Sequence, residues 1–173
     1  VRIENARRWE GIKDPYLYTV VAALADGTLS EKFGCRTFDI DSQKGFLLNG
    51  HPYPLRGVSM HQDVKGMGNA ITKTVLDQNM AFVREIGANT LRLAHYQHAQ
   101  YFYDLCDREG IVVWAEIPFI TMFMPKGREC TLQMMRELIA QNYNHASIAV
   151  WGLSNEITAA SAVNEELLDN HRA

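Results

Sequence analysis

The pattern of apolar and polar positions divides the chain near residue 41. In the first part, residues 16–21 are rich in aromatic and β-branched side chains, and Asp26-Gly27 is a strong hairpin signal ahead of a second strand at 32–40. Two strands alone do not make a stable sheet. Residues 1–40 are therefore predicted to be the last strands of an all-β domain whose other strands precede Val1.

From residue 41 onward, short apolar runs alternate with amphipathic stretches. A hairpin at 46–53 turns at Asn49-Gly50, which suits a type I′ turn. Apolar runs predict strands at 55–58, 90–94, 111–115 and 148–153, while helical patterns open with a capping box at 74–77 and recur at 100–109, 131–141 and 162–168. The first two helices are expected to bury Leu76, Met80, Val83, Phe102, Leu105 and Cys106, and to end at Gly87 and Gly110.

This alternation predicts an α/β fold with a parallel sheet covered by helices. A doubly wound sheet usually carries a glycine-rich phosphate loop, but Gly66-Met67-Gly68 lacks a third glycine and lies too far from a helix start. A (β/α)₈ TIM barrel is therefore preferred. Residues 41–173 hold about four βα units, roughly half of the ~250 residues that such a barrel needs.

Composition narrows the possible partners. The 173 residues carry a formal net charge of −3, with acids and bases interspersed, which gives no reason to expect nucleic acid or an anionic membrane as partner. Small neutral ligands remain open. No apolar run approaches the roughly 20 residues that cross a bilayer, and the first residues do not resemble a signal peptide. The three cysteines, Cys35, Cys106 and Cys130, are expected to be reduced structural thiols.

Polar, titratable residues recur where each predicted barrel strand ends. His61 and Asp63 follow the first strand, His95 the second, Glu116 the third and Asn155-Glu156 the fourth. Any one of them could be an ordinary hydrogen-bonded loop residue. Active sites of these barrels are built at the carboxyl ends of the strands, so four successive cases favour a shared site.

Two further features have alternative interpretations. Arg92 lies inside an apolar strand, where a guanidinium is costly unless it meets a carboxylate; the alternative is a helix terminus or an outer carbonyl. His95 and His98 are close enough to suggest a metal site, but His98 is placed in a helix turn and Cys106 is too distant to join obviously.

Glycosidic bond cleavage needs two carboxyl groups. Glu156 suits the general acid because Trp151 and Leu153 supply apolar surface that favours the protonated form. Asn155 is suited to bind a sugar hydroxyl, and Trp151 either stacks on a sugar or packs in the core. Glu116 fits the second carboxylate on spacing alone.

Several long motifs now carry a family resemblance. GVSMHQD at 57–63, GANTLRLAHY at 87–96 and the run from NH at 144–145 to WGLSNE at 151–156 resemble glycoside hydrolase family 2. FYDLCD at 102–107 and VWAEIP at 113–118 are similar to its bacterial β-galactosidases. Departures are Met60, where a basic residue is common, and Gln97 and Ala146, where proline is frequent.

The resemblance implies an immunoglobulin-like sandwich ending near Ile40 and a TIM barrel after it, with Glu156 as the acid/base. The nucleophile would be another Glu on the seventh strand, after Ala173. It further implies that His61, Asp63, His95 and Asn155 line the sugar subsite, that Arg92 supports the carboxylates and that Glu116 lines the site. Some members hold magnesium through a Glu and a His after the third strand, but residues 117–122 contain neither, so no metal and no cofactor are expected.

The resemblance predicts hydrolysis of terminal β-D-galactosides with retention of configuration, in a bacterial cytoplasm, with the periplasm, secretion and a homo-oligomer left open. A β-glucuronidase-like activity is the alternative within the enzyme class. A non-catalytic fragment with at most weak sugar binding is the other class, because the 173 residues carry only one of the two catalytic carboxyl groups.

Overall fold

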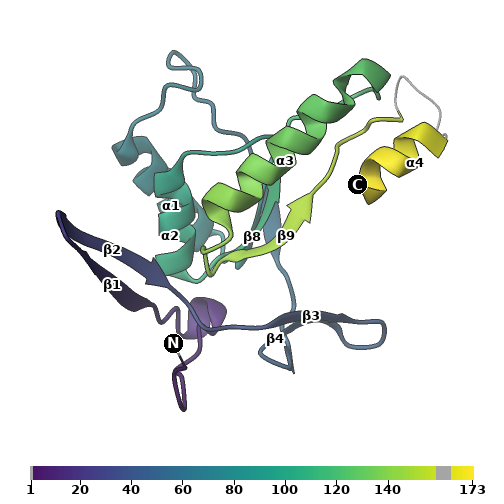
Figure 1. Cartoon of the computed structure of the whole chain (residues 1–173). Helices are drawn as coiled ribbons and strands as arrows, with labels where there is room; N and C mark the ends of the chain where they lie inside the picture. The colour runs from purple at the N-terminus through teal and green to yellow at the C-terminus, as the bar shows by residue number, and fades with distance from the viewer. Residues whose placement is uncertain (1, 159–164) are drawn as a thin grey trace.

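A computed structural model describes residues 2–158 and 165–173. In these ranges, a parallel sheet contains the strands β6 (Gly57–Met60), β7 (Thr90–Leu93), β8 (Val112–Glu116) and β9 (Ile148–Gly152), adjacent in that order. The helices α1 (Lys73–Glu85), α2 (Gln100–Glu109) and α3 (Arg128–Asn142) connect successive strands, and α4 (Glu165–Arg172) follows β9 (Figure 1). Short 3₁₀ turns lie at Gly11–Lys13 and Pro125–Gly127. This strand order agrees with the predicted beginning of a (β/α)₈ barrel.

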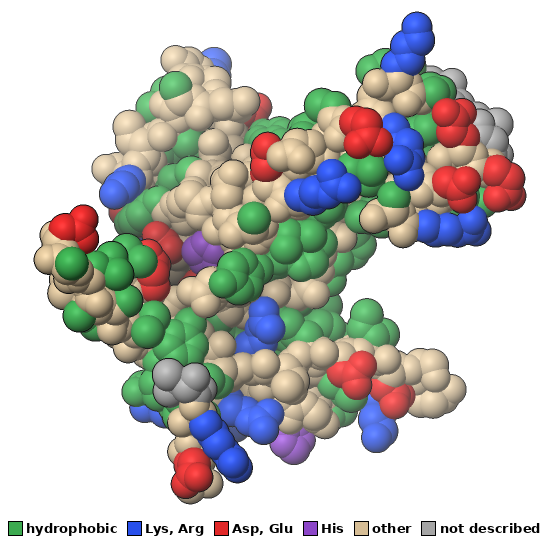
Figure 2. All heavy atoms as spheres, viewed as in Figure 1, with side chains coloured by type: hydrophobic (Ala, Val, Ile, Leu, Met, Phe, Trp, Pro, Cys, Tyr) green, Lys and Arg blue, Asp and Glu red, His purple; other side chains and the backbone are tan. Residues whose placement is uncertain are grey.

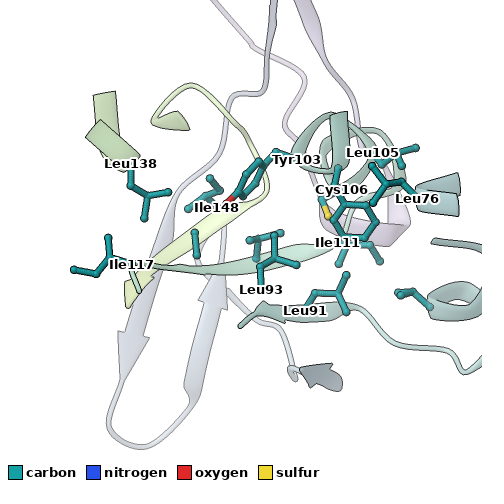
Figure 3. Close-up of a cluster of buried hydrophobic side chains, with 14 of the residues drawn as sticks. Leu76, Leu91, Leu93, Tyr103, Leu105, Cys106, Ile111, Ile117, Leu138 and Ile148 are labelled. Carbon is teal, nitrogen blue, oxygen red and sulfur yellow. The ribbon is translucent and has the colours of Figure 1, made fainter. Parts of the chain in front are cut away.

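The helices bury one face of this sheet. Leu91 and Leu93 of β7 are inaccessible to solvent, and they belong to one core cluster with side chains from all four helices and from β8 and β9 (Figure 3). The cluster includes Leu76 and Met80 of α1, Phe102, Tyr103 and Cys106 of α2, Leu138 of α3 and Leu167 of α4. Within the described ranges, no helix combines the length and the apolar character required to cross a membrane.

The opposite face of the sheet carries a different set of side chains. Ser59, Arg92, Trp114 and Val150 are register partners across the four strands, and they alternate with the core residues. Trp114 is 42% exposed although its strand is central in the sheet. Large apolar side chains are exposed at other places on the molecule as well, and Figure 2 shows several hydrophobic patches between polar and backbone atoms on one face. In a closed barrel, the Arg92–Trp114 face would be the interior.

The N-terminal part forms two small antiparallel sheets. One pairs β1 (Tyr18–Leu24) with β2 (Gly27–Phe33), and the other joins β3 (Phe38–Asp41), β4 (Gly45–Leu48) and β5 (His51–Pro52). Trp9 is fully buried in a second cluster with Leu48, Val112 and Ala146, and its indole N–H donates to the carbonyl of Asp107 at 2.8 Å. This cluster attaches the N-terminal segment to the amino-terminal end of the parallel sheet.

Most predicted elements are present, with shifted ends. The helix predicted at 100–109 is confirmed, and the turn at Asn49-Gly50 has the positive φ angles that a type I′ turn requires. The strands predicted at 55–58, 111–115 and 148–153 become β6, β8 and β9 with ends displaced by one or two residues. Residues 162–164, the start of the last predicted helix, lie outside the described residues.

Two sequence predictions are wrong. The single strand expected at 32–40 is instead divided between β2, which begins at Gly27 and ends at Phe33, and β3, which begins at Phe38, because the chain leaves the hairpin between them. Arg36 there donates to the carbonyls of Ala146 and Ile148 at 3.1 and 3.0 Å. The capping box expected at 74–77 is also absent: α1 begins at Lys73, and the Thr72 side chain accepts from the backbone N–H of Val75.

Gly152 occupies a position where the sheet has no room for a side chain. A Cβ built on it would lie 2.3 Å from Trp114 Nε1 and 2.6 Å from Glu116 Cγ. The indole is partly exposed and has some freedom to move, but the Glu116 side chain is buried and ion-paired. The absence of a side chain at Gly152 therefore leaves the space that the Glu116 side chain occupies.

We predict that Gly152→Ala destabilises the protein by about 1–3 kcal/mol, as overpacking does in tightly packed sites, and lowers Tm by several degrees. Thermal unfolding followed by circular dichroism measures this effect. Gly127→Ala is the matched control, because a Cβ there meets Met124 Cβ at an ordinary 3.7 Å. Equal Tm values for the two variants would contradict the steric argument.

Candidate active site

Glu116 is the centre of a polar cluster at the carboxyl end of the sheet. Its side chain is 1% exposed, and its Oε1 accepts from Arg92 Nε while its Oε2 lies 2.9 Å from His95 Nδ1. A buried carboxylate is tolerated only with such partners. The predicted pairing of Arg92 with a carboxylate is thus confirmed, and the partner is Glu116.

The charged partners of Asn155 and His95 indicate which of their polar atoms donate and which accept hydrogen bonds. Arg92 Nη2 donates to Asn155 Oδ1 at 2.7 Å. A guanidinium has no acceptor, so the oxygen of the amide must face it and Nδ2 remains the donor of Asn155. His95 Nδ1 lies 2.9 Å from Glu116 Oε2 and 3.2 Å from Arg92 Nη2. A carboxylate only accepts, so in the shorter of these two contacts Nδ1 is the donor. Neither Asn155 Nδ2 nor His95 Nε2 has a hydrogen-bond partner among residues 2–158 and 165–173.

The segment after β9 is held by the loop after β8. The backbone N–H of Asn155 donates to the carbonyl of Phe119 at 2.9 Å, and its carbonyl accepts from the N–H of Thr121 at 3.0 Å. These bonds place Asn155 beside Arg92 and bring Glu156 to the edge of the cluster. Glu156 adopts φ +53°, in the left-handed region that is uncommon for a residue with a side chain.

Glu156 differs from Glu116 in its surroundings. The residue is exposed, and no hydrogen bond or ion pair joins its carboxyl group to another residue of the described ranges. Glu116 is buried and holds two cationic or hydrogen-bonding partners. The two carboxyl groups predicted from strand-end positions therefore have opposite environments, one with fixed partners and one without.

His61 lies next to the cluster, whereas Asp63 does not join it. The His61 ring is 5.0 Å from the His95 ring in an edge-to-face arrangement, and its Nδ1 is 3.5 Å from the hydroxyl of Tyr96. Asp63 is exposed, and in the described parts of the chain no hydrogen bond or ion pair connects it to the other predicted residues. The structure thus brings together His61, Arg92, His95, Glu116 and Asn155.

The structure places Trp151 on a different face of the sheet from the predicted site residues. It pairs with Ala115 in the sheet register and packs against the main core, on the face that the helices cover. Strand alternation requires this, because Gly152 pairs with Glu116 on the other face. The prediction that Trp151 lines the sugar site is therefore wrong, and so is the idea that it gives Glu156 an apolar environment. The tryptophan that shares a face with Arg92 is Trp114, and its position two residues before Glu116 was the sequence signal for it.

The metal-site alternative is not supported by the donor geometry. His98 is buried and its Nε2 contacts the carbonyl of Ala94 at 3.1 Å, while His95 points its Nδ1 at Glu116. Among the described residues, no group of three or more His, Cys, Asp or Glu side chains is arranged to hold an ion. Cys106 is buried in the core, and burial raises the pKa of its thiol.

A hollow of about 740 Å³ lies away from this cluster. It is lined by residues of the β1–β2 hairpin, of α2 and of the segment between α3 and β9, including Lys32, Asp104, Arg108, Tyr143 and His145. None of the predicted site residues lines it. The predicted site residues therefore lie at the carboxyl edge of the sheet and not in this hollow.

Comparisons with known proteins agree with the geometry. Residues 39–172 match the family model for glycosyl hydrolases family 2, TIM barrel domain. The chain is 44% identical over 169 residues to a β-glucuronidase of Bacteroides fragilis, which covers 90% of this chain and 24% of that protein. It is 29% identical over 167 residues to a β-galactosidase of Bacteroides ovatus, and this match covers 90% of this chain and 20% of that protein.

A solved structure is similar over nearly the whole chain. The FMN-binding β-glucuronidase from Faecalibacterium prausnitzii L2-6 superposes with a TM-score of 0.90 at 45% identity, covering 96% of this chain and 27% of that one. The chain thus spans about a quarter of the length of the proteins it matches. The predicted TIM barrel is confirmed, and the chain belongs to glycosyl hydrolase family 2, of whose barrel domain it carries a part.

Proposed function

We propose that the complete protein is a retaining β-glucuronidase, and that this chain supplies the general acid/base and part of the sugar-binding site. The observation that carries the proposal is the Arg92–Glu116–His95–Asn155 cluster at the carboxyl ends of parallel strands, directly before Glu156. In a TIM barrel enzyme this is where the chemistry takes place. The first forty residues are proposed to belong to an immunoglobulin-like domain beside the barrel.

The different surroundings of the two carboxyl groups support their assignment. A general acid/base must hold a proton in one step and release it in the next. Glu116 is buried, and its two oxygens are already engaged by Arg92 and His95, so neither is available to a leaving-group oxygen. The Glu156 carboxyl group is exposed and has no such partner in the described ranges, so it is free to meet the substrate. We therefore assign the acid/base role to Glu156 and a supporting role to Glu116.

The same cluster offers sugar hydroxyls one donor and one acceptor. Asn155 presents the N–H bonds of its amide, because Arg92 occupies its oxygen. In the tautomer that donates from Nδ1 to Glu116, His95 presents Nε2 as an acceptor. A hydroxyl group has both a donor and lone pairs, so it is able to bind to either atom. His61 lies against His95 and is proposed to extend this surface, together with Asp63 on the same loop.

The choice of a glucuronide over a galactoside rests on the relatives. The protein with 44% identity is named β-glucuronidase, as is the solved structure with 45% identity. A solved structure from Bacteroides fragilis that is named putative β-galactosidase is 41% identical, and the β-galactosidase of Bacteroides ovatus is 29% identical. Sequence motifs alone favoured the galactoside and kept the glucuronide as the alternative. The two sugars differ at C6, where a glucuronide carries a carboxylate that needs polar or cationic partners.

We predict that the complete enzyme hydrolyses p-nitrophenyl β-D-glucuronide with a kcat/KM roughly 10³-fold or more above that for p-nitrophenyl β-D-galactoside. A site that pairs the sugar carboxylate leaves its own polar groups unpaired with the galactoside, and such mismatches are discriminated strongly. Initial rates of p-nitrophenol release measure both constants. A preference for the galactoside would overturn the glucuronide assignment but not the hydrolase class.

We predict a leaving-group dependence for Glu156→Gln in the complete enzyme. For glucuronides with a poor leaving group, kcat should fall by about 10²–10⁴-fold, because the departing oxygen then needs a proton. For 2,4-dinitrophenyl glucuronide the loss in the glycosylation step should be much smaller, since this leaving group departs without protonation. Pre-steady-state release of the phenol measures that step.

A matched control accompanies this variant. Glu166→Gln changes an exposed carboxyl group in α4 and should leave both substrates at wild-type rates. A Glu156→Gln enzyme that loses the same factor with both substrates would not have lost a general acid, and the assignment would then be withdrawn.

A further inference from the structure

His98 is a buried side chain that the proposed reaction does not use directly. The residue lies between β7 and α2 and is 3% exposed. Its Nε2 is 3.1 Å from the carbonyl oxygen of Ala94, and its backbone N–H donates to the hydroxyl of Tyr103 at 3.3 Å. Tyr103 is itself buried in the core. The core thus holds the backbone of His98, and the imidazole contacts the end of β7.

The two ring nitrogens of His98 define its protonation. A carbonyl oxygen only accepts hydrogen bonds, so Nε2 carries the proton and donates to Ala94. Nδ1 is buried without a hydrogen-bond partner among the described residues, and an N–H there would be left unsatisfied. Burial lowers the pKa of His98 to about 4, so the ring is neutral at ordinary pH. His98 is therefore a permanent one-proton donor to one carbonyl.

The carbonyl that His98 binds precedes His95 in the chain. Ala94 is fixed on its other side as well, because its N–H donates to the carbonyl of Met60 at 3.0 Å. Because both the N–H and the carbonyl of Ala94 are hydrogen-bonded, the position of Ala94 determines the position of the His95 backbone. His95 then reaches Glu116 Oε2 at 2.9 Å. A shift of the Ala94 carbonyl would move the histidine that holds Glu116.

His98 also supports the neighbouring loop through Tyr96. The two rings are stacked, with centroids 5.2 Å apart and planes 25° from parallel. The Tyr96 hydroxyl accepts from the backbone N–H of Gln62 at 3.1 Å, and the Gln62 side chain accepts from the N–H of Ala99 at 2.6 Å. The loops after β6 and β7 are therefore joined around the His98 ring.

We propose that His98 is a positioning residue: its Nε2–H holds the Ala94 carbonyl and thereby sets the geometry of His95 against Glu116, while its ring supports Tyr96 beside His61. This inference rests on the proposed glycosidase function of the cluster. It assigns no contact between His98 and the substrate. The histidine acts through the backbone of the segment that carries His95.

The test compares three variants of the complete enzyme. His98→Gln places an amide N–H close to the former Nε2, whereas His98→Asn is too short to reach the Ala94 carbonyl and His98→Leu has no donor. We expect His98→Asn and His98→Leu to lose roughly ten- to hundredfold in kcat/KM, the scale on which small misplacements of catalytic groups act. His98→Gln should recover most of the wild-type value. His51→Leu, at an exposed histidine of β5, is the control without effect.

The pattern across substrates separates positioning from proton transfer and from simple instability. The loss should be the same for good and poor leaving groups, and KM should change together with kcat, because the sugar-binding cluster is displaced. Unfolding would instead lower the concentration of active enzyme and leave KM unchanged. If His98→Leu does not fold, the Gln and Asn pair still decides: equal activity of these two, or a higher activity for Asn, overturns the proposal.

Crystal structures of the Gln and Asn variants provide a readout that needs no activity. The His95 Nδ1–Glu116 hydrogen bond should persist in His98→Gln and be lengthened or lost in His98→Asn. Wild-type enzyme that cleaves neither glucuronides nor galactosides would defeat the proposed function, yet these structures would still test the positioning. An unchanged His95 in His98→Asn would defeat the positioning and leave the proposed function standing.

Discussion

The buried charge of Glu116 is the constraint on which the site depends. A carboxylate that is 1% exposed at the end of a central strand requires compensation, and Arg92 in β7 and His95 after β7 provide it. The guanidinium of Arg92 also donates to Asn155, which follows β9. The contacts of Glu116 and Arg92 thereby join the ends of three strands.

The same constraint explains features of the sheet that would otherwise be unfavourable. Gly152 leaves the space in which the Glu116 side chain lies, although a glycine inside a strand is disfavoured. Arg92 and Trp114 lie side by side on the face away from the helices, so this face is not a simple apolar surface. The helices cover only the opposite face, where Leu91 and Leu93 are fully buried. One face of the sheet therefore packs against the helices, and the other carries Arg92 and Trp114.

The sequence predicted those features whose signals are local. The helix at 100–109 has amphipathic spacing and a terminal glycine with φ +74°, and both of its ends agree. The pairing of Arg92 was predictable because a guanidinium in an apolar strand needs a carboxylate. The face of Trp151 was not, because β9 is apolar along its length and a register shift opposite Val113 and Trp114 breaks simple alternation. The role of His98 had no signal either, since its partner is a backbone carbonyl placed by the fold.

The contrast between Glu116 and Glu156 goes beyond what strand-end positions alone decide. Both residues follow apolar strands, and either could be the acid by spacing. The structure gives one a guanidinium and burial and leaves the other exposed without an ionic partner in the described ranges. The carboxyl group of Glu116 already holds Arg92 and His95, as expected of a residue that orients its neighbours. The carboxyl group of Glu156 is exposed and has no fixed partner in the described ranges, which leaves it free for the acid/base role that we propose.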